Sequence, residues 1–287
     1  MLNWEDLRYF IAVANTGSLS AAARLLHVDH ATVSRRINSL ETSLQNQLVD
    51  RNSRACYLTP FGQQILDIAI KMEESAFAIQ RASLAAKESI TGKVIVSAPP
   101  VLATHLLAKN LNNFHQRHPN IQISIASQAM RVSLSKREAD IALRLVRPTE
   151  NNDVARKLGN MPFALYAHKN YPYRNDPLHW GFIGYDSQFS DMPHAKWIIE
   201  AAKNQRIICE VSDITSQLIA VKSGVGVGSL PCFIGDNEPE LQRLQFDGKI
   251  YAPEVWLVVH ADLRSSPLLR IVLDFMIEVI PTNLRLI

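Results

Sequence analysis

The chain has 287 residues, 47% of them hydrophobic and 20% charged, with a formal net charge of +3. This length is too great for one compact domain, so two or three folded units are expected. The sequence shows no signal-peptide pattern, which would combine a basic start, an apolar stretch and a cleavage site. Apolar runs such as 255–259 are too short to span a bilayer. The three widely spaced cysteines exclude a disulfide framework and a paired-cysteine zinc site. We therefore expect a soluble cytoplasmic protein with no bound metal or cofactor.

The first 45 residues are patterned as three consecutive helices. Residues 4–15 repeat apolar side chains at helical spacing, which predicts a first helix with one buried stripe. A glycine ends this helix, and Ser18 is positioned to cap a second one whose alanines at 21–23 allow close packing. Residues 27–29 form a turn, and Asp29 is placed to cap a third helix, where its negative charge also suits the helix dipole.

The third helix separates into an apolar stripe and a polar face. Val33, Ile37, Leu40 and Leu44 are spaced four, three and four residues apart and point inward. The remaining surface carries His30, Ala31, Thr32, Ser34, Arg35 and Arg36. A helix that enters the DNA major groove needs small residues near its start, hydroxyl groups and arginine on such a face. The pattern predicts a helix-turn-helix, although an ordinary helical hairpin with a solvated charged face has the same spacing.

A short two-stranded wing is predicted after these helices. Residues 48–51 and 57–59 read as the strands, and the tip between them carries Arg51 and Arg54, suited to phosphates or the minor groove. Overall charge does not indicate nucleic acid, because the first 92 residues contain nine basic and nine acidic residues. The hypothesis therefore requires the arginines to share one face. The predicted DNA-binding residues are His30, Ala31, Thr32, Ser34, Arg35, Arg36, Arg51, Arg54 and Thr59.

Motifs in this order resemble the LysR-type transcriptional regulators along the whole chain. The matching pieces are Leu7 to Phe10, Gly17-Ser18, Ala22-Ala23 with Leu26, Val33-Ser34-Arg35-Arg36-Ile37 with Leu40-Glu41, and Leu58-Thr59-Pro60-Phe61-Gly62. Each piece is short, but their order and spacing together are highly specific. The chain departs from the family pattern at Asp29-His30-Ala31, so no base preference carries over, and at Val49, where relatives have phenylalanine.

A long helix is predicted from residue 60 to about residue 89. Thr59 caps it and Pro60 occupies its first turn, and no further proline interrupts it. A seam of apolar and small residues follows a three-four alternation: Ile65, Ile68, Met72, Ser75, Ile79, Ala82 and Ala86. Such a helix could pack on its own domain, but some 30 residues span about 45 Å, more than a small domain's width. We expect a dimerising rod, as the resemblance also implies.

The rest of the chain alternates strands and helices, which predicts an α/β fold with a parallel sheet. Strands are expected at 93–97, 121–125, 141–146, 180–185, 207–211, 225–230 and 255–260, and helices at 100–118, 134–139, 213–222 and 267–280. Crossings near 162–168 and 260–266 would create two lobes with a cleft between them. The resemblance implies a winged helix-turn-helix domain at 1–59, a linker helix at 60–90 and a periplasmic-binding-protein-like effector domain at 91–287. Within the last, lobe I is expected at 91–163 and 265–287, and lobe II at 164–264.

Ligands in such sheets lie beyond the carboxyl ends of strands, beside helix starts. Two such points stand out, at 97–100, with Thr104 in the following turns, and at 212–215. Thr104 is therefore a candidate effector-binding residue. The resemblance implies that the rest of the effector site is made of Ser97, Pro99, Pro100, Ser127, Gln128, Arg144, Val146, Tyr185, Asp186 and Gly226. Two prolines stand where many relatives have serine or threonine, which removes hydroxyl and N–H donors from that helix start. Ser97 could instead cap a helix, and Arg144 could pair with an internal acid.

The resemblance implies a nucleoid-associated regulator whose DNA binding or bending is modulated by a small-molecule effector bound between the lobes. Its expected partners are promoter DNA with an interrupted palindrome, further copies of the chain in a homodimer or homotetramer, and RNA polymerase. Two alternatives come from other classes of protein. The two lobes would suit a solute-binding protein of a transport system, which the N-terminal module opposes. The α/β fold would suit an enzyme, but the sequence has no catalytic triad, paired carboxylates or nucleophile elbow.

Overall fold

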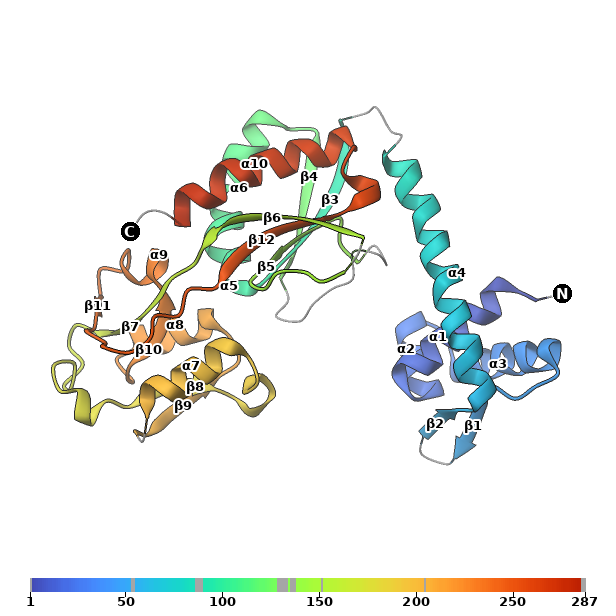
Figure 1. Cartoon of the computed structure of the whole chain (residues 1–287), viewed down its shortest axis with the longest axis horizontal. Helices are drawn as coiled ribbons and strands as arrows, with labels where there is room; N and C mark the ends of the chain where they lie inside the picture. The colour runs from blue at the N-terminus through green and yellow to red at the C-terminus, as the bar shows by residue number, and fades with distance from the viewer. Residues whose placement is uncertain are drawn as a thin grey trace. The chain divides into compact units, whose positions relative to one another are not determined.

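The computed structural model describes residues 2–52, 55–85, 90–127, 134, 138–150, 152–203 and 205–284 (Figure 1). Its contacts divide the chain into two compact units, residues 1–80 and 81–287. No helix in the described part of the chain combines the length and apolar content that a bilayer crossing requires. The predicted class, a helical N-terminal module followed by an α/β domain, is confirmed.

The first unit contains the three predicted helices and the wing. They are α1 (Trp4–Thr16), α2 (Leu19–Leu26), α3 (His30–Leu44), β1 (Val49–Asn52) and β2 (Ala55–Leu58). The caps form as predicted, because the Ser18 hydroxyl accepts from the Ala21 N–H at 3.0 Å and Asp29 accepts from the Thr32 N–H at 2.6 Å. The helices enclose a core in which Phe10, Val33 and Ile37 are fully buried. This core makes the unit a solid support for the outer face of α3.

The wing is joined to the helices through backbone groups and one acidic side chain. The Glu41 carboxylate accepts from the N–H groups of Leu48, at 2.8 Å, and Val49, at 3.1 Å. The Cys56 N–H donates to the Gly17 carbonyl at 3.0 Å, and Gly17 has the positive φ of 68° that ends α1. The direction of the wing is therefore fixed by α1 and α3.

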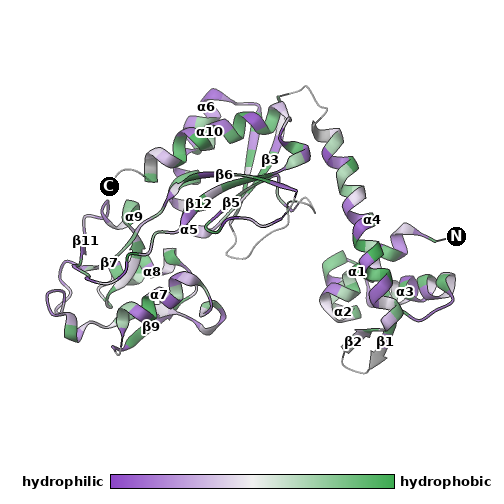
Figure 2. Ribbon diagram, in the orientation of Figure 1, coloured by the Kyte–Doolittle hydropathy of each residue, from purple (hydrophilic) through white to green (hydrophobic). Residues whose placement is uncertain are grey.

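Helix α4 (Pro60–Ala85) follows the wing and carries both hydrophilic and hydrophobic segments along its length (Figure 2). The Thr59 hydroxyl caps it by accepting from the Gly62 N–H at 2.9 Å and itself donates to the Gln47 carbonyl at 2.8 Å. A Cβ atom on Gly62 would lie 2.1 Å from the Leu48 carbonyl oxygen. Only glycine allows the first turn of α4 to approach the wing this closely.

The first lobe of the second unit is built on a five-stranded sheet of order β4-β3-β5-β12-β6. The strands are β3 (Gly92–Ala98), β4 (Ile121–Ser127), β5 (Ile141–Arg144), β6 (Asp153–Asn160) and β12 (Glu254–His260). Strands β3, β4 and β5 are parallel, as predicted, whereas β12 runs antiparallel to β5 and β6, so the sheet is mixed.

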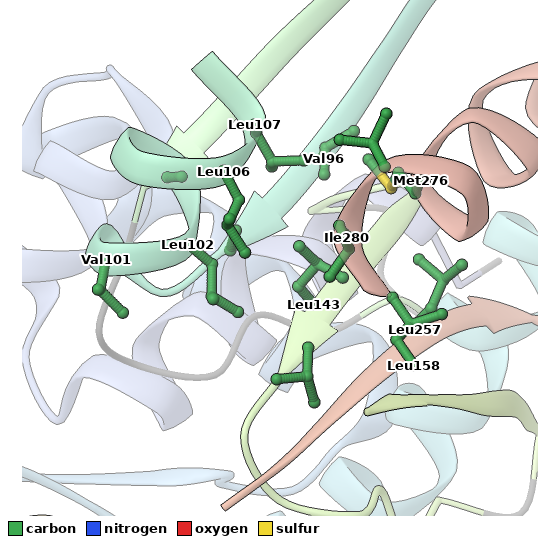
Figure 3. Close-up of a cluster of buried hydrophobic side chains, with 14 of the residues drawn as sticks. Val96, Val101, Leu102, Leu106, Leu107, Leu143, Leu158, Leu257, Met276 and Ile280 are labelled. Atoms are coloured by element: carbon green, nitrogen blue, oxygen red, sulfur yellow. The ribbon is translucent and has the colours of Figure 1, made fainter. Parts of the chain in front are cut away.

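Helices cover this sheet and complete its core. Residues 100–117 form α5 (Pro100–Leu102), a π-helical segment η1 (Ala103–Ala108) and α6 (Lys109–Arg117), and the chain ends in α10 (Pro267–Leu284). Side chains from these helices and from the sheet point toward one another, among them Leu102, Leu143 and Ile280, which are fully buried (Figure 3). Half of the predicted helix at 134–139, residues 135–137, lies outside the described residues.

The second lobe contains two small sheets, of order β10-β7-β11 and β8-β9. Their strands are β7 (Phe163–His168), β8 (Phe182–Tyr185), β9 (Ile207–Val211), β10 (Gly228–Pro231) and β11 (Leu241–Arg243). The helices are α7 (Pro193–Ala202), α8 (Ile214–Lys222) and α9 (Cys232–Gly235). The parallel pair β8 and β9 and the helix α8 correspond to predicted elements.

The predicted position of the second crossing between the lobes was wrong. We expected the chain to cross near 260–266, with 255–260 in the second lobe, but β12 lies between β5 and β6 in the first lobe's sheet. The chain therefore crosses before Glu254, and β7 shows that the first crossing is complete by residue 163. The two crossing segments are hydrogen-bonded, since Met161 N–H donates to Pro253 O and Phe163 N–H to Tyr251 O, both at 2.8 Å.

Candidate DNA-binding surface and effector cavity

Helix α3 presents a continuous polar surface near its N-terminus. Its inward residues Val33, Ile37 and Leu40 are fully buried, which fixes the rotation of the helix about its axis. On the opposite face His30, Ala31 and Arg35 are exposed, while Thr32 and Ser34 are half-buried. The arrangement suits a helix that approaches a groove, because small side chains surround a projecting guanidinium.

The cap at the start of α3 engages part of that surface. Asp29 accepts from the Thr32 N–H at 2.6 Å and from the Thr32 hydroxyl at 3.0 Å. These hydrogen bonds from Thr32 lower the pKa of the Asp29 carboxyl below its usual range. Thr32 therefore stabilises the start of α3. The sequence predicts only a contact with DNA bases for this residue.

Arg36 is tied to the interior of the unit. Its guanidinium lies 3.1 Å from the carboxylate of Asp6, whose side chain is 5% exposed, and 5.8 Å from the Tyr9 ring centre. The Ser39 hydroxyl donates to the same carboxylate at 2.8 Å. This ion pair links α3 to α1, so Arg36, unlike Arg35, helps to hold the two helices together.

The remaining predicted DNA-binding residues belong to the wing and its junction with α4. The backbone of Arg51 pairs with Cys56 in the β1–β2 ribbon, whereas Arg54 lies outside the described residues. Thr59 is half-buried and its hydroxyl is engaged by the α4 cap, as described above. The described residues thus bring together His30, Ala31, Thr32, Ser34 and Arg35 on α3.

An apolar stripe lies exposed on α4. Ile68, Met72 and Ile79 are 56%, 41% and 74% exposed, and their spacing of four and seven residues places them on one face. Ile65 is half-buried beside them, and Ala86 lies outside the described residues. A helix face with three such side chains in water favours contact with another apolar surface.

The second unit contains a cavity of about 180 Å³ between its two lobes. It lies at the carboxyl ends of β3, β5 and β8, beside the starts of α5, α7 and α8. Five of the predicted effector residues line it, namely Pro99, Pro100, Arg144, Val146 and Tyr185. The Arg144 guanidinium donates to the Ser97 hydroxyl at 3.2 Å and to the Leu143 carbonyl at 3.1 Å.

Other predicted effector residues do not line this cavity. Ser97 is fully buried behind Arg144, Thr104 and Ser127 are exposed elsewhere, and Asp186 caps a 3-10 turn through the Gln188 N–H. Gly226 packs against the Gly181 carbonyl, where a Cβ atom would come within 2.4 Å. Gln128 lies outside the described residues.

His194 is a wall residue that sequence reasoning missed. It lies in α7, and its ring nitrogens are hydrogen-bonded to the hydroxyls of Tyr185, at 2.9 Å, and Ser229, at 2.8 Å. Its ring centre is 4.3 Å from that of Phe163 and 5.3 Å from that of Tyr251. Burial lowers the pKa of His194 to about 3, so the ring is neutral at physiological pH. The proline before it, followed by Trp197 and Ile198 at helical spacing, could have revealed α7.

Asp213 places a carboxylate at the edge of the cavity. It caps α8 by accepting from the Ser216 N–H at 2.9 Å and from the Ser216 hydroxyl at 2.7 Å. Burial opposes its ionisation, but hydrogen bonds, chiefly those from Ser216, leave its pKa below the usual range. Tyr185 and Tyr251 complete the wall, and burial raises the pKa of both hydroxyls. The cavity is therefore mainly aromatic and apolar, with two charged groups.

A helix-turn-helix module followed by a two-lobed domain with an interlobe cavity defines a ligand-responsive DNA-binding protein. The family models agree with this class. The model of the bacterial regulatory helix-turn-helix protein, lysR family, matches residues 4–63, and that of the LysR substrate binding domain matches residues 87–281. The chain belongs to the LysR family and is a DNA-binding transcriptional regulator with an effector-binding domain, not an enzyme.

Full-length relatives are similar over nearly the whole chain. The Mau operon transcriptional activator of Paracoccus denitrificans is 27% identical over 272 residues, which cover 94% of this chain and 93% of that protein. The HTH-type transcriptional regulator CrgA of Neisseria meningitidis is 28% identical over 300 residues and 98% of both chains.

Solved structures show the same architecture. The structure of CrgA from Neisseria meningitidis has a TM-score of 0.54 at 27% identity and covers 97% of this chain and 99% of that chain. The structure of the full-length virulence activator AphB from Vibrio cholerae has a TM-score of 0.58 at 21% identity and covers 96% of this chain and 99% of that chain, which supports the fold alone.

Proposed function

We propose that the exposed N-terminal face of α3 reads the bases of promoter DNA through His30, Thr32, Ser34 and Arg35, with Ala31 allowing close approach. The observation that carries this proposal is the exposure of Arg35 among small residues on a helix whose other face is fixed in the core. Arg51, Arg54 and Thr59 contact the DNA backbone on this account. Arg36 serves first to hold α3 against α1, and its guanidinium, with its side chain 36% exposed, can also approach a phosphate.

The cavity between the lobes is the effector site in this proposal, and its occupancy regulates DNA binding or bending. The two hydrogen-bonded crossing segments at 161–163 and 251–253 form a hinge about which the lobes can close. A ligand that contacts both lobes binds the closed form better, and it shifts the population toward that form by its difference in affinity. Of the predicted residues, Pro99, Pro100, Arg144, Val146 and Tyr185 contact the effector directly.

Self-association follows from the apolar stripe on α4. Pairing of Ile68, Met72 and Ile79 with the same stripe of a second chain removes their side chains from water. A homodimer then presents two copies of α3 to the two halves of an interrupted palindrome, about one helical turn or a multiple of it apart. A homotetramer built from two such pairs and a contact with RNA polymerase complete the proposal.

A gel-shift titration of the full-length protein on the DNA that flanks its own gene tests this function. Arg35→Ala is expected to weaken specific binding by about 10- to 100-fold, the range for losing a bidentate base contact. The matched control is Arg8→Ala, because Arg8 is exposed on α1 and pairs only with the nearby Glu5 among the described contacts. Equal binding by the wild type and Arg35→Ala would contradict the assignment of α3 as the reading helix.

A further inference from the structure

The interlobe cavity has the volume to enclose a molecule built on a single ring. An apolar cavity of about 150 Å³ binds benzene, and this one has a volume of about 180 Å³. Phe163, Tyr185, His194 and Tyr251 supply aromatic walls, and prolines and aliphatic side chains supply most of the rest. A planar ring with one small substituent matches these walls in size and in polarity.

Two of the three helix starts beside the cavity, those of α5 and α8, have few free donors for an anion. At α5, Pro99 and Pro100 have no N–H group, and the N–H groups of Leu102 and Ala103 donate to the Pro99 carbonyl. At α8 the donors are occupied by the chain's own carboxylate, that of Asp213. An anionic ligand would meet missing donors at one wall and a negative charge at the other.

The one cationic side chain among the described residues of the wall, Arg144, has acidic side chains on its far side. Arg144 separates the cavity from a smaller one that is also lined by Glu150 and Asp153. Arg144 lies close enough to Asp153 to favour its ionised form, although burial and the neighbouring Glu150 raise the pKa of Asp153 overall. Carboxyl groups therefore lie on both sides of this wall, Asp213 in the cavity and Glu150 and Asp153 in the smaller one, and their charges oppose the attraction of an anion to Arg144.

We propose that the effector is an uncharged, mainly apolar molecule of one-ring size with a hydrogen-bond acceptor directed at Arg144. This inference rests on the proposed role of the cavity as the effector site. His194 contributes a flat neutral surface, because its two nitrogens are held by hydroxyl groups and offer the ligand no charge. A free carboxylate in the cavity would face the Asp213 carboxylate, and an ammonium group would face the Arg144 guanidinium.

The matched pair benzamide and benzoate tests the charge of the ligand at constant size. In ligand-observed NMR titrations of the full-length protein at neutral pH, benzamide is expected to bind at least about fivefold more tightly, the effect of one uncompensated charge in a partly solvated cleft. Benzoate binding as tightly as benzamide would overturn the proposal. Binding of neither probe would overturn it as well, because a neutral ring then does not fit the cavity.

Asp213→Asn tests the cause of the preference, because asparagine keeps the cap of α8 and removes the charge. It is expected to raise the affinity for benzoate several-fold and to leave that for benzamide within twofold. Asp186→Asn is the matched control, since Asp186 also caps a turn but does not line the cavity. An unchanged benzoate affinity in Asp213→Asn would refute the electrostatic argument.

Val146→Trp separates failure of this inference from failure of the proposed site. Val146 lines the cavity and is 51% exposed, so a larger side chain can fill the cavity without disturbing the core. Loss of benzamide binding in this variant, with an unchanged melting temperature, places the probe in the cavity. Unchanged benzamide binding would show that the cavity is not the effector site. If the wild type prefers benzoate and Val146→Trp loses this preference, the cavity remains the effector site and only the proposed class of ligand is overturned.

Discussion

The surface on α3 and the interlobe cavity are built in opposite ways. The predicted base-reading residues lie within six consecutive positions, 30–35, on one helix, and they are polar groups on the outside of a packed core. The cavity wall takes residues from segments as distant as Pro99 and Tyr251, and most of its polar groups already have partners inside the protein. Local sequence therefore determines the first site, whereas the second depends on how the whole domain folds.

Each site also has its own kind of vulnerability. The DNA-reading surface depends on backbone positions and buried pairs behind α3, so mutations beneath it are expected to act through stability. The cavity depends on charges and shapes at its wall, so mutations there are expected to act through ligand binding. Mutations and pH changes can therefore separate these two behaviours.

Gly62→Val is expected to have the largest effect, a loss of about 3 kcal/mol in the stability of the first unit. Even a Cβ atom at this position would overlap the Leu48 carbonyl oxygen. Thermal unfolding of the variant should show the transition of residues 1–80 at a lower temperature and an unchanged transition for the effector domain. Gln63→Val on the exposed side of the same turn is the control, and equal losses in both variants would refute the steric explanation.

Arg36→Ala is expected to destabilise the first unit by about 2 kcal/mol, because it leaves the buried Asp6 carboxylate with too few partners. The Ser39 hydroxyl remains, at 2.8 Å, but the guanidinium at 3.1 Å is lost. Chemical denaturation measures the change, and Arg8→Ala, which removes an exposed pair, should change stability by less than about 0.5 kcal/mol. A stable Arg36→Ala variant that nevertheless loses DNA affinity would assign Arg36 to phosphate contact instead.

Arg144→Met is expected to weaken binding of an effector-sized probe such as benzamide by about tenfold, the range for losing a hydrogen bond from a charged donor. DNA affinity should stay unchanged, because Arg144 lies in the other unit. Arg147→Met is the matched control, since Arg147 lies over the Trp256 ring at 5.5 Å and does not line the cavity. A normal probe affinity in Arg144→Met would remove Arg144 from the site.

The stability of the effector domain is expected to fall as the pH falls below about 6.5. His194 resists protonation in the folded protein, with a pKa of about 3, whereas in the unfolded chain it takes up a proton near its usual pKa of 6.5. The unfolded state then binds more protons, which costs the folded state about 1 kcal/mol per pH unit between about pH 6 and pH 4. His194→Gln should flatten this dependence in denaturation curves, and an equally steep dependence would assign it to other groups.

The sequence predicted the first unit well because its signals are short-range. These signals act within one or two turns of a helix. They are the caps Ser18 and Asp29, the helical spacing of Val33 and Ile37, and Pro60 directly after Thr59. The ion pair of Arg36 with Asp6 was missed because it joins residues 30 positions apart, and no local pattern marks it.

In the second unit, strand order was the main source of error. β12 has the buried pattern expected of a strand, but nothing in residues 254–260 says that it lies between β5 and β6. The strand β6, with three charged residues and a glycine, carries no apolar pattern and was not predicted. Ser97 and Gly226 were placed at the site by resemblance, whereas packing puts both behind the wall. Asp213 belongs to the helix start at 212–215 that the sequence indicated, whereas His194 reaches the cavity through tertiary structure alone.

A footprint of the full-length protein on the DNA upstream of its own gene tests whether α3 reads the operator. Two protected segments are expected, with centres about one helical turn apart or a multiple of it, and both should disappear with Arg35→Ala. Uniform, sequence-independent protection that Arg35→Ala leaves intact would contradict this role of α3.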